Sequence, residues 1–357
     1  MGKVMIVEAI KNNIKGIQLS SEDAASAMKE IMSGTATPSQ IAAFLISLSM
    51  KGESVKEITA LAQTMKEFAN KINPVYQDRL VDIVGTGGDK IKTINLSTIS
   101  AFVVATAGVK VAKHGNRAAT GKCGSADVLN RLGYKLDTKP DLVKRCIEEV
   151  GIGFMFAPIF HPAMKNVIMT RKEIGVKTIF NILGPLTNPA SADSMVVGVA
   201  DSKLIQPYAE ILPNLGCKRA VIVHGIDGLD EIATFGKTKM RFIGDIENDG
   251  KEITVEAKDF NLREITPEEI TGRGIDYNEK IMFQILSNQL PLDNPNVEAV
   301  IANSAIGFLI AAEATSIGEG VEKAKEVIAS GRCIDKLKEF VKFVEGDMTK
   351  IEEFESS

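Results

Sequence analysis

Hydrophobic and polar residues follow a helical repeat over about the first 70 positions of the chain. Apolar residues three or four positions apart, such as Ile41, Phe44 and Leu48, predict a buried helix face. Three segments suit helix starts: Ser20-Ser21-Glu22-Asp23, Thr37-Pro38-Ser39-Gln40 and Ser54-Val55-Lys56-Glu57. We expect the first helix to end at Ser33-Gly34 and the third near Ala69.

From residue 80 onward, short apolar runs alternate with helical segments, which is typical of a largely parallel sheet flanked by helices. The predicted strands are 80–84, 109–112, 153–156, 194–199 and 220–223. Two further runs, 241–243 and 253–255, are expected to be antiparallel or peripheral, and the polar segment 259–296 to be connecting structure. The sequence therefore predicts the α/β class. A small helical domain, residues 1–73 completed by helices from about 163–190, precedes a larger α/β domain, 74–357, with a mostly parallel central sheet.

The composition argues against several classes of function. The 357 residues carry a net charge of −4, from 42 basic and 46 acidic side chains, and no tryptophan. We therefore expect neither nucleic acid nor a membrane as a partner. No apolar run is long enough to span a membrane, and the N-terminus becomes charged too early for a signal peptide. Four dispersed cysteines and three histidines indicate a reducing compartment without a cysteine or histidine metal centre, so we expect a cytoplasmic protein.

A glycine-rich segment follows the predicted strand 80–84. It reads Gly85-Thr86-Gly87-Gly88-Asp89, and Ser97 or Thr98 can cap a helix through 99–107 that stops at Gly108. Backbone without Cβ atoms lets a phosphate approach the positive end of that helix. The spacing excludes a Walker loop and a dinucleotide fingerprint. A phosphate loop ending in a carboxylate remains, and it suits a sugar hydroxyl or a metal-bound phosphate; the alternative is a glycine turn without a ligand.

A second loop, 113–127, follows the strand 109–112 and brings Lys113, Arg117 and Lys122 to the same sheet edge. Two cationic glycine-rich loops at one edge indicate a substrate with more than one phosphate, although a solvated basic turn is the simpler alternative for the second loop. Ser125 suits either ligand binding or an N-cap for a helix that ends at Gly133.

Charged residues outside the two loops could bind a metal ion or the carboxylate of a substrate. Asp230-Glu231 follows the strand 220–223, and Mg²⁺ commonly uses one or two carboxylates together with substrate phosphate oxygens. An exposed acidic turn is the alternative, but the neighbouring phosphate loops favour a metal. Arg171, on a helix expected to end near Gly175, presents a fork that matches a carboxylate, or is a surface arginine. His161, before a proline, suits a packed loop histidine as well as a catalytic one.

Taken in order, these motifs resemble the anthranilate phosphoribosyltransferases of tryptophan biosynthesis over nearly the whole chain. The resemblance rests on segments 40–45, 50–52, 85–89, 95–98, 113–118, 124–127, 171–189 and 230–231. It implies transfer of the phosphoribosyl group from 5-phospho-α-D-ribose 1-diphosphate (PRPP) to the amine of anthranilate, with release of diphosphate. It also implies a homodimer joined through the helical domain, and two Mg²⁺ ions per subunit.

The resemblance further implies roles for individual residues. Those for PRPP are Gly85, Gly88, Asp89, Thr93, Asn95, Leu96, Ser97, Thr98, Lys113, His114, Gly115, Asn116, Arg117, Ala118, Ala119, Thr120, Gly121 and Ser125. Those for anthranilate are Gly85, Asn116, His161, Arg171 and Pro185, and those for Mg²⁺ are Ser97, Asp230 and Glu231. The chain departs from the family in the bulky, basic Lys90-Ile91-Lys92 and in Thr120 and Cys123, where serine is common.

Two other functions fit parts of the pattern. A pyrimidine-nucleoside phosphorylase shares the architecture and first glycine loop, but tends to carry Ser-Gly-Arg where this chain has Gly115-Asn116-Arg117, and needs no carboxylate clamp at Arg171. An inactive homologue that binds nucleic acid would need a basic groove and would lose the acidic pair. This mildly acidic chain keeps Asp230-Glu231, so the transferase is favoured.

Overall fold

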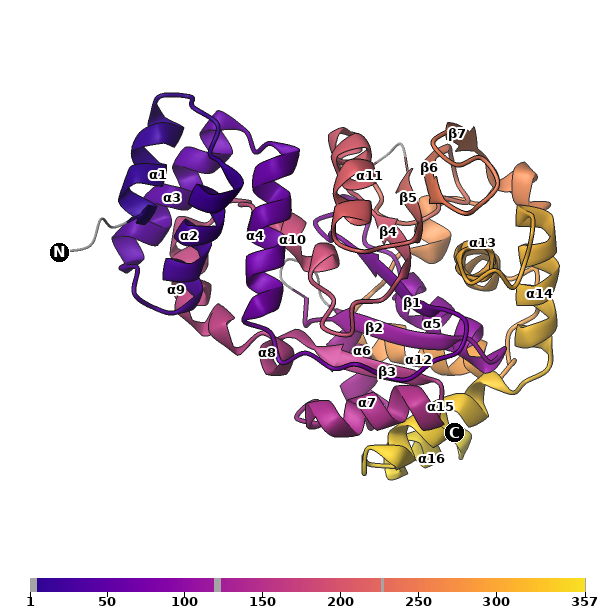
Figure 1. The fold of residues 1–357 in the computed structure, drawn as a ribbon. Coiled ribbons are helices and arrows are strands. Elements are labelled where there is room, and N and C mark those ends of the chain that lie inside the picture. The colour runs from indigo at the N-terminus through magenta and orange to yellow at the C-terminus, as the bar shows by residue number, and fades with distance from the viewer. Residues whose placement is uncertain (1–4, 119–122, 226–227, 357) are drawn as a thin grey trace.

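The computed structural model describes residues 5–118, 123–225 and 228–356, and it divides into a helical bundle and an α/β body (Figure 1). The first four helices are α1 (Met5–Ile14), α2 (Ser21–Met32), α3 (Pro38–Lys51) and α4 (Val55–Glu67). Ser20, Thr37 and Ser54 are the N-caps of α2, α3 and α4, as predicted. Each side chain accepts a hydrogen bond from the backbone N–H three residues on, which the start of the helix would otherwise leave unpaired.

The central sheet has seven strands in the order β3-β2-β1-β4-β5-β6-β7. They are β1 (Leu80–Gly85), β2 (Lys110–Gly115), β3 (Ile152–Phe156), β4 (Ser194–Gly198), β5 (Arg219–Gly225), β6 (Thr238–Gly244) and β7 (Glu252–Val255). The first five are parallel and the last two antiparallel, which confirms the predicted sheet. The chain passes from β1 outward to β2 and β3, then returns to β4 on the other side of β1, so the strand order reverses at β1. Ligands in open α/β sheets bind at such a reversal.

Helices cover both faces of the sheet, because side chains along each buried strand alternate between two apolar clusters. Val196 and Val221 join the cluster of the C-terminal helices, whereas Val197 and Ile222 join the cluster on the opposite face. The remaining helices are α5 (Leu96–Thr106), α6 (Ser125–Arg131), α7 (Pro140–Glu149), α8 (Ala157–Phe160), α9 (Lys165–Ile174), α10 (Phe180–Leu186), α11 (Ile205–Asn214), α12 (Ile275–Leu286), α13 (Pro295–Ile310), α14 (Ile317–Ala329), α15 (Cys333–Phe343) and α16 (Thr349–Glu355).

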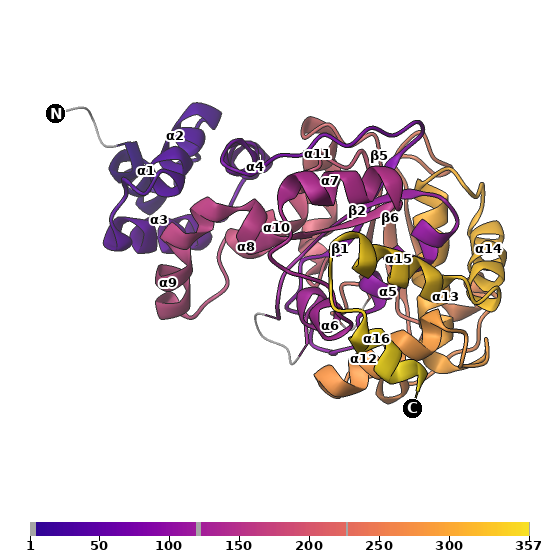
Figure 2. The same ribbon diagram turned by 90° about the horizontal axis from the view of Figure 1, so that it is seen from below.

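Two later helices return to the N-terminal bundle. Figure 2 shows α9 beside α1–α3, with α10 between the bundle and the sheet. Val167 of α9 and Leu183 of α10 are fully buried in the same apolar cluster as Phe44 and Leu61. The segment that connects β3 to β4 therefore lies partly in the bundle, and it brings Arg171 and Lys177 with it.

Three local predictions were wrong. The segment 259–296 is not only connecting structure, because it contains α12, whose Met282 and Phe283 are buried. Its buried polar residues, Asn278 among them, lowered the apparent hydrophobicity of the segment. The other errors concern helix starts and the end of a strand.

Ser97 and Thr98 do not cap α5, which begins at Leu96 after Asn95, and Ser125 does not cap α6, whose N-cap is Gly124. In α5 the N–H of Ser97 binds the distant carboxylate of Glu231, and in α6 the N–H of Gly124 binds Asp127 of the helix's own first turn, so neither helix needs a hydroxyl cap. The strand β2 also extends beyond residue 112, so Lys113 and His114 lie in the strand and not in the loop.

Among the described residues, no helix is both long and apolar enough to cross a membrane.

Candidate active site

Asp230 lies against the carboxyl ends of β1 and β4. Its Oδ2 accepts a hydrogen bond of 2.6 Å from the backbone N–H of Gly87. A Cβ atom on Gly85 would lie 2.3 Å from that oxygen, and one on Gly198 would lie 1.5 Å from the Asp230 carbonyl oxygen. Glycine at these two strand ends is therefore what allows Asp230 to approach the first loop.

Glu231 binds the start of α5. One carboxylate oxygen accepts from the backbone N–H of Ser97 at 2.9 Å, and the other accepts from the Thr93 hydroxyl at 3.1 Å. Because the first N–H groups of a helix lack intrahelical partners and carry partial positive charge, they stabilise this carboxylate. Asn303 of α13 supports the site from behind, since its side chain accepts from the Ile232 N–H and donates to the Ile232 carbonyl.

Both carboxylates are half-buried, and neither forms an ion pair with a described residue. Burial, with the neighbouring Asp89 charge adding to it, raises the pKa of Asp230 to about 6. Burial, with the Asp230 charge adding to it, raises the pKa of Glu231 to about 8. A divalent cation would stabilise both charged forms. Among the described residues there is no cluster of three or more acidic, histidine or cysteine side chains that could hold a metal. Further ligands would have to come from the Ser97 hydroxyl, water or a bound phosphate.

Lys113 provides a buried positive charge at the same strand end. Its Nζ donates to the carbonyl of Ile83 at 2.7 Å and to the Ser97 hydroxyl at 3.4 Å. Burial lowers the pKa of Lys113, against the opposing effect of Asp82 and Glu231. The structure thus brings Lys113 together with the predicted metal ligands at the start of α5.

The first loop bends through two left-handed glycines, Gly87 and Gly88, with φ of +67° and +77°. It ends in Asp89, whose carboxylate forms an ion pair of 2.9 Å with Lys92. Lys177, between α9 and α10, donates to the Gly88 carbonyl at 3.3 Å. This lysine was missed in the sequence, because nothing in the pattern indicated that the segment after α9 would reach the first loop.

Asp127 joins the two ends of the second loop. Its carboxylate accepts from the N–H groups of Ala118 and Gly124, at 3.0 and 2.9 Å, and from the Arg117 guanidinium at 2.7 Å. Arg117 is therefore already paired and is not an unpartnered cation facing the first loop. The predicted residues Ala119, Thr120 and Gly121, together with Lys122, lie outside the described residues.

Hydrogen bonds connect the second loop to α5. The hydroxyls of Thr98 and Ser125 lie 3.0 Å apart, and Asn95 donates to the Cys123 carbonyl at 3.3 Å. Asn278 of α12 donates to the Asn95 side chain at 3.0 Å, so α12 also contributes to this part of the site. Of the other predicted residues, Leu96 is the first residue of α5 and Gly115 the last residue of β2.

His114 and His161 pack against each other with ring centroids 5.1 Å apart. Burial lowers the pKa of His114 to about 3, with the neighbouring His161 adding to the effect. Burial lowers the pKa of His161 to about 4. Both rings are therefore neutral at neutral pH, which favours the packed alternative for His161 over a protonated catalytic group.

The predicted carboxylate clamp lies on α9. Arg171 is half-buried, and its guanidinium lies 5.4 Å from the ring centroid of Phe180. Within the described residues it forms no ion pair, and burial lowers its pKa. The predicted Pro185 is buried inside α10, and the Asn116 side chain accepts from the N–H of Arg117. No hydrogen bond joins Arg171 to Asn116 among these residues.

A buried network that the sequence analysis missed lies behind the first loop. Asp82 accepts from the Asn188 side chain at 2.7 Å, and Asn188 also donates to the Ala112 carbonyl at 2.8 Å. Burial raises the pKa of Asp82 to about 6, although the nearby Lys113 charge opposes the shift. An acidic residue in an apolar strand was the available signal for it.

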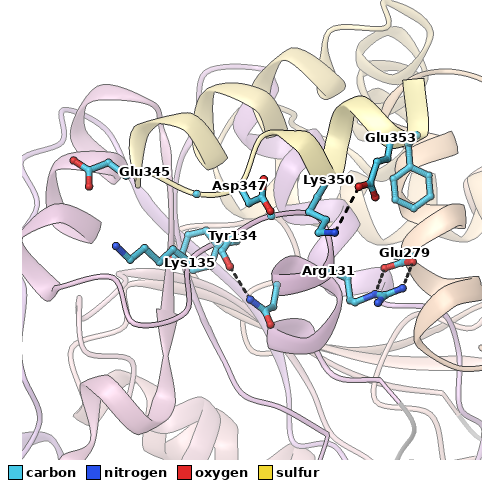
Figure 3. Close-up of a pocket in the computed structure, with 12 residues that line it drawn as sticks. Arg131, Tyr134, Lys135, Glu279, Glu345, Asp347, Lys350 and Glu353 are labelled. Carbon is cyan, nitrogen blue, oxygen red and sulfur yellow. Dashed lines mark hydrogen bonds and ion pairs between the residues drawn. The ribbon is translucent and has the colours of Figure 1, made fainter. Parts of the chain in front are cut away.

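A separate cavity of about 780 Å³ lies between the C-terminal end of α6 and α16 (Figure 3). Arg131 forms two hydrogen bonds with Glu279 there, and Lys350 pairs with Glu353 at 3.6 Å. None of the residues lining this cavity belongs to the predicted site, and these four charges neutralise one another. The loops at the carboxyl ends of the strands therefore remain the candidate active site.

Family models match both parts of the chain. Residues 7–69 match the model described as "Glycosyl transferase family, helical bundle domain", and residues 77–334 match "Glycosyl transferase family, a/b domain".

Several relatives and solved structures are similar to the chain over nearly its whole length. The anthranilate phosphoribosyltransferases of Persephonella marina and Geobacter sulfurreducens are each 44% identical to this chain. The matches cover 95% and 94% of the chain, and 99% of each relative. The crystal structure of the Thermus thermophilus enzyme superposes with a TM-score of 0.88 at 40% identity, covering 94% of this chain and 99% of that one. The Saccharomyces cerevisiae enzyme, in complex with PRPP and Mg, superposes with a TM-score of 0.89 at 28% identity, covering 96% and 99%.

Proposed function

This chain belongs to the anthranilate phosphoribosyltransferase family, and we propose that the loops around β1 carry out the family reaction. The protein transfers the 5-phosphoribosyl group from PRPP to anthranilate and releases diphosphate, a step of tryptophan biosynthesis. The observation that carries this proposal is the position of Asp230 and Glu231. Two half-buried carboxylates lie against the glycine loop and the start of α5, where a diphosphate and a metal ion would meet.

The diphosphate and ribose of PRPP would bind between the two loops. The N–H groups of the first loop and the ammonium group of Lys113 supply positive potential, and Asp89 suits a ribose hydroxyl. The N–H groups of 85–89, the start of α5 and Ser125 complete this half of the site, as the resemblance implies.

The acidic pair fits Mg²⁺. Asp230, Glu231 and the Ser97 hydroxyl would hold it, because both carboxylates are half-buried with raised pKa values and neither forms an ion pair with a described residue. The chemistry that bound Mg²⁺ supplies is neutralisation of the charge that develops on diphosphate as it leaves. We propose two ions per subunit, as the resemblance implies, with water and phosphate oxygens completing their coordination.

Anthranilate would bind at the bundle side of the site. Arg171 supports this assignment, because its guanidinium has no carboxylate partner among the described residues and can pair with the anthranilate carboxylate bidentately. Asn116, Gly85, His161 and Pro185 would complete the pocket. Since the bound amine is unprotonated at neutral pH, these residues act by orientation, and no single side chain serves as an obligate general base.

A homodimer through the helical bundle fits the exposed apolar residues. Met50 at the end of α3 is 84% exposed, and Ile168 and Met169 on α9 are 50% and 61% exposed. We propose that residues 1–73, together with helices from about 163–190, form the associating domain and that 74–357 form the PRPP-binding domain. The four cysteines are free thiols, which supports a cytoplasmic location.

Product analysis tests the proposed function. Purified protein is incubated with PRPP, Mg²⁺ and anthranilate, and the products are separated, then identified and quantified by mass spectrometry. We expect N-(5-phosphoribosyl)anthranilate and diphosphate in equal amounts. Phosphorolysis of thymidine or uridine, with no product from anthranilate, would instead identify a pyrimidine-nucleoside phosphorylase.

A further inference from the structure

Lys92 places an ammonium group on Asp89, beside the candidate metal site. Its Nζ lies 2.9 Å from the Asp89 carboxylate, and the Asp89 side chain is 12% exposed whereas that of Lys92 is 40% exposed. Lys92 belongs to the basic segment 90–92 that the sequence analysis singled out as bulkier and more basic than expected for the family.

The backbone holds Lys92 next to the acidic pair. The N–H of Gly272 donates to the Lys92 carbonyl at 2.8 Å, and the following residue, Thr93, donates through its hydroxyl to Glu231. A Cβ atom on Gly272 would lie 2.6 Å from the Thr93 carbonyl oxygen, so the two segments approach as closely as the backbone allows. The side chain of Lys92 starts beside the partner of Glu231 and ends at Asp89.

The same carboxylates would attract a metal ion. Asp89 lies two residues after Gly87, whose N–H binds Asp230, and its charge adds to the rise in the pKa of both Asp230 and Glu231, so the three carboxylates interact although they do not form a three-ligand metal cluster. Without a metal ion, an ammonium group stabilises such a cluster by the same electrostatic attraction. A metal ion that approaches Asp89 must displace this ammonium group or bind against its charge.

We propose that Lys92 acts as an internal counter-cation that competes with Mg²⁺ for the acidic cluster while PRPP is absent. The proposal rests on the metal site of the proposed function. Phosphates of the bound donor would offer the flexible lysine another anion and free Asp89. The metal ion would then bind the protein weakly in the absence of PRPP and more tightly once PRPP is bound.

Direct metal titration without substrates tests the proposal. Binding of Mn²⁺, as a probe for Mg²⁺, is measured by the electron paramagnetic resonance signal of the free ion, for native protein and for Lys92→Met. Removing a partly exposed ion pair should tighten Mn²⁺ binding about three- to fivefold. Lys92→Arg, which keeps the positive charge, should stay within about twofold of the native affinity.

The neighbouring lysine provides the matched control. Lys90, whose side-chain stem packs at Gly228, carries the same charge two residues away, and Lys90→Met should change the affinity less than Lys92→Met. Equal effects of the two substitutions would overturn the proposal, because net charge alone would explain them. Absence of Mn²⁺ binding to native protein and Lys92→Met alike would also overturn it. The product assay described above reports separately on the reaction.

Discussion

The carboxylate of Glu231 accepts a hydrogen bond from the backbone N–H of Ser97, 2.9 Å away, although 134 positions separate the two residues in the sequence. The bond connects the loop after β5 to the first turn of α5, across the point where the strand order reverses. One carboxylate thereby satisfies a helix N–H and forms half of the candidate metal site. This double role explains why the predicted hydroxyl caps of α5 are not used.

Alanine substitutions at the glycines that end β1 and β4 should have different effects, one mainly on activity and the other mainly on stability. In Gly85→Ala the new methyl group would collide with the Asp230 carboxylate, which can move, so we expect the activity to fall at least tenfold with a small loss of stability. In Gly198→Ala the collision is with the Asp230 backbone, so we expect unfolding at markedly lower temperature. Thermal unfolding and initial rates measure both effects.

Gly318→Ala is the control for these substitutions. Gly318 lies in α14, and among the described residues no atom beyond its own helical backbone and chain neighbours would come within 4 Å of the alanine methyl group. Alanine there should stabilise the helix by about 0.5–1 kcal/mol. If Gly85→Ala left the activity at the level of Gly318→Ala, the close approach of Asp230 to the first loop would have no functional role.

Arg171→Ala should weaken anthranilate binding selectively. Losing a bidentate, charge-assisted contact of about 2–3 kcal/mol lowers kcat/KM for anthranilate about 30- to 150-fold, while KM for PRPP changes less than about twofold. Arg171→Lys should recover only part of the loss, because an ammonium group lacks the planar fork. Steady-state kinetics with each substrate varied in turn gives these values.

Lys172→Ala is the matched control, since Lys172 is exposed on the same turn of α9. Similar losses for Lys172→Ala and Arg171→Ala would mean that α9 contributes general positive charge and not a specific clamp.

Lys177→Met should weaken the binding of the donor, PRPP. The ammonium group of Lys177 binds the Gly88 carbonyl, so it places positive charge beside the expected diphosphate position. We expect KM for PRPP to rise about three- to tenfold, KM for anthranilate to remain nearly constant, and Lys177→Arg to restore most of the affinity. A rise confined to KM for anthranilate would place Lys177 in the acceptor pocket instead.

The buried Asp82 should make the protein less stable as the pH rises. Its pKa in the folded protein is about 6, above the ordinary value of 3.8, so between these pH values only the folded state keeps the proton. Stability is therefore lost from about pH 4 to about pH 6 and then stays constant, with a difference of up to about 3 kcal/mol from this group. Asp82→Asn should flatten that part of the curve in urea unfolding measured from pH 4 to pH 8.

A control at Asp249 uses an exposed-loop carboxylate that caps a turn by accepting from the Gly244 N–H. Asp249→Asn should leave the pH dependence of unfolding between pH 4 and 6 as in the native protein. An unchanged curve for Asp82→Asn would show that Asp82 is ionised in the folded state over the whole range.

The sequence predicted the elements whose signals are local. Capping residues such as Thr37 and Ser54 marked helix starts, and the apolar runs after residue 80 marked parallel strands. The helix α12 escaped detection because Asn278 and Glu279 are buried through hydrogen bonds with Asn95 and Arg131, and such partners cannot be read from the local pattern.

Within the site, the motifs identified the loops but not the contacts between them. Asp230 and Glu231 were found because adjacent carboxylates at a strand end are a local feature. The contacts of Lys177 with Gly88 and of Asn303 with Ile232 depend on segments that meet only in the folded chain. They could not be predicted from spacing.

The most direct test of the account compares native protein with Glu231→Gln in the loss of anthranilate fluorescence, with PRPP present and Mg²⁺ varied. Glutamine keeps the size of the side chain and an acceptor for the Ser97 N–H, but removes the charge that would hold the metal. We predict Mg²⁺-dependent loss of fluorescence with native protein and a rate about 10²-fold lower with the folded variant. Equal rates for the two proteins, or no loss with native protein, would contradict the account.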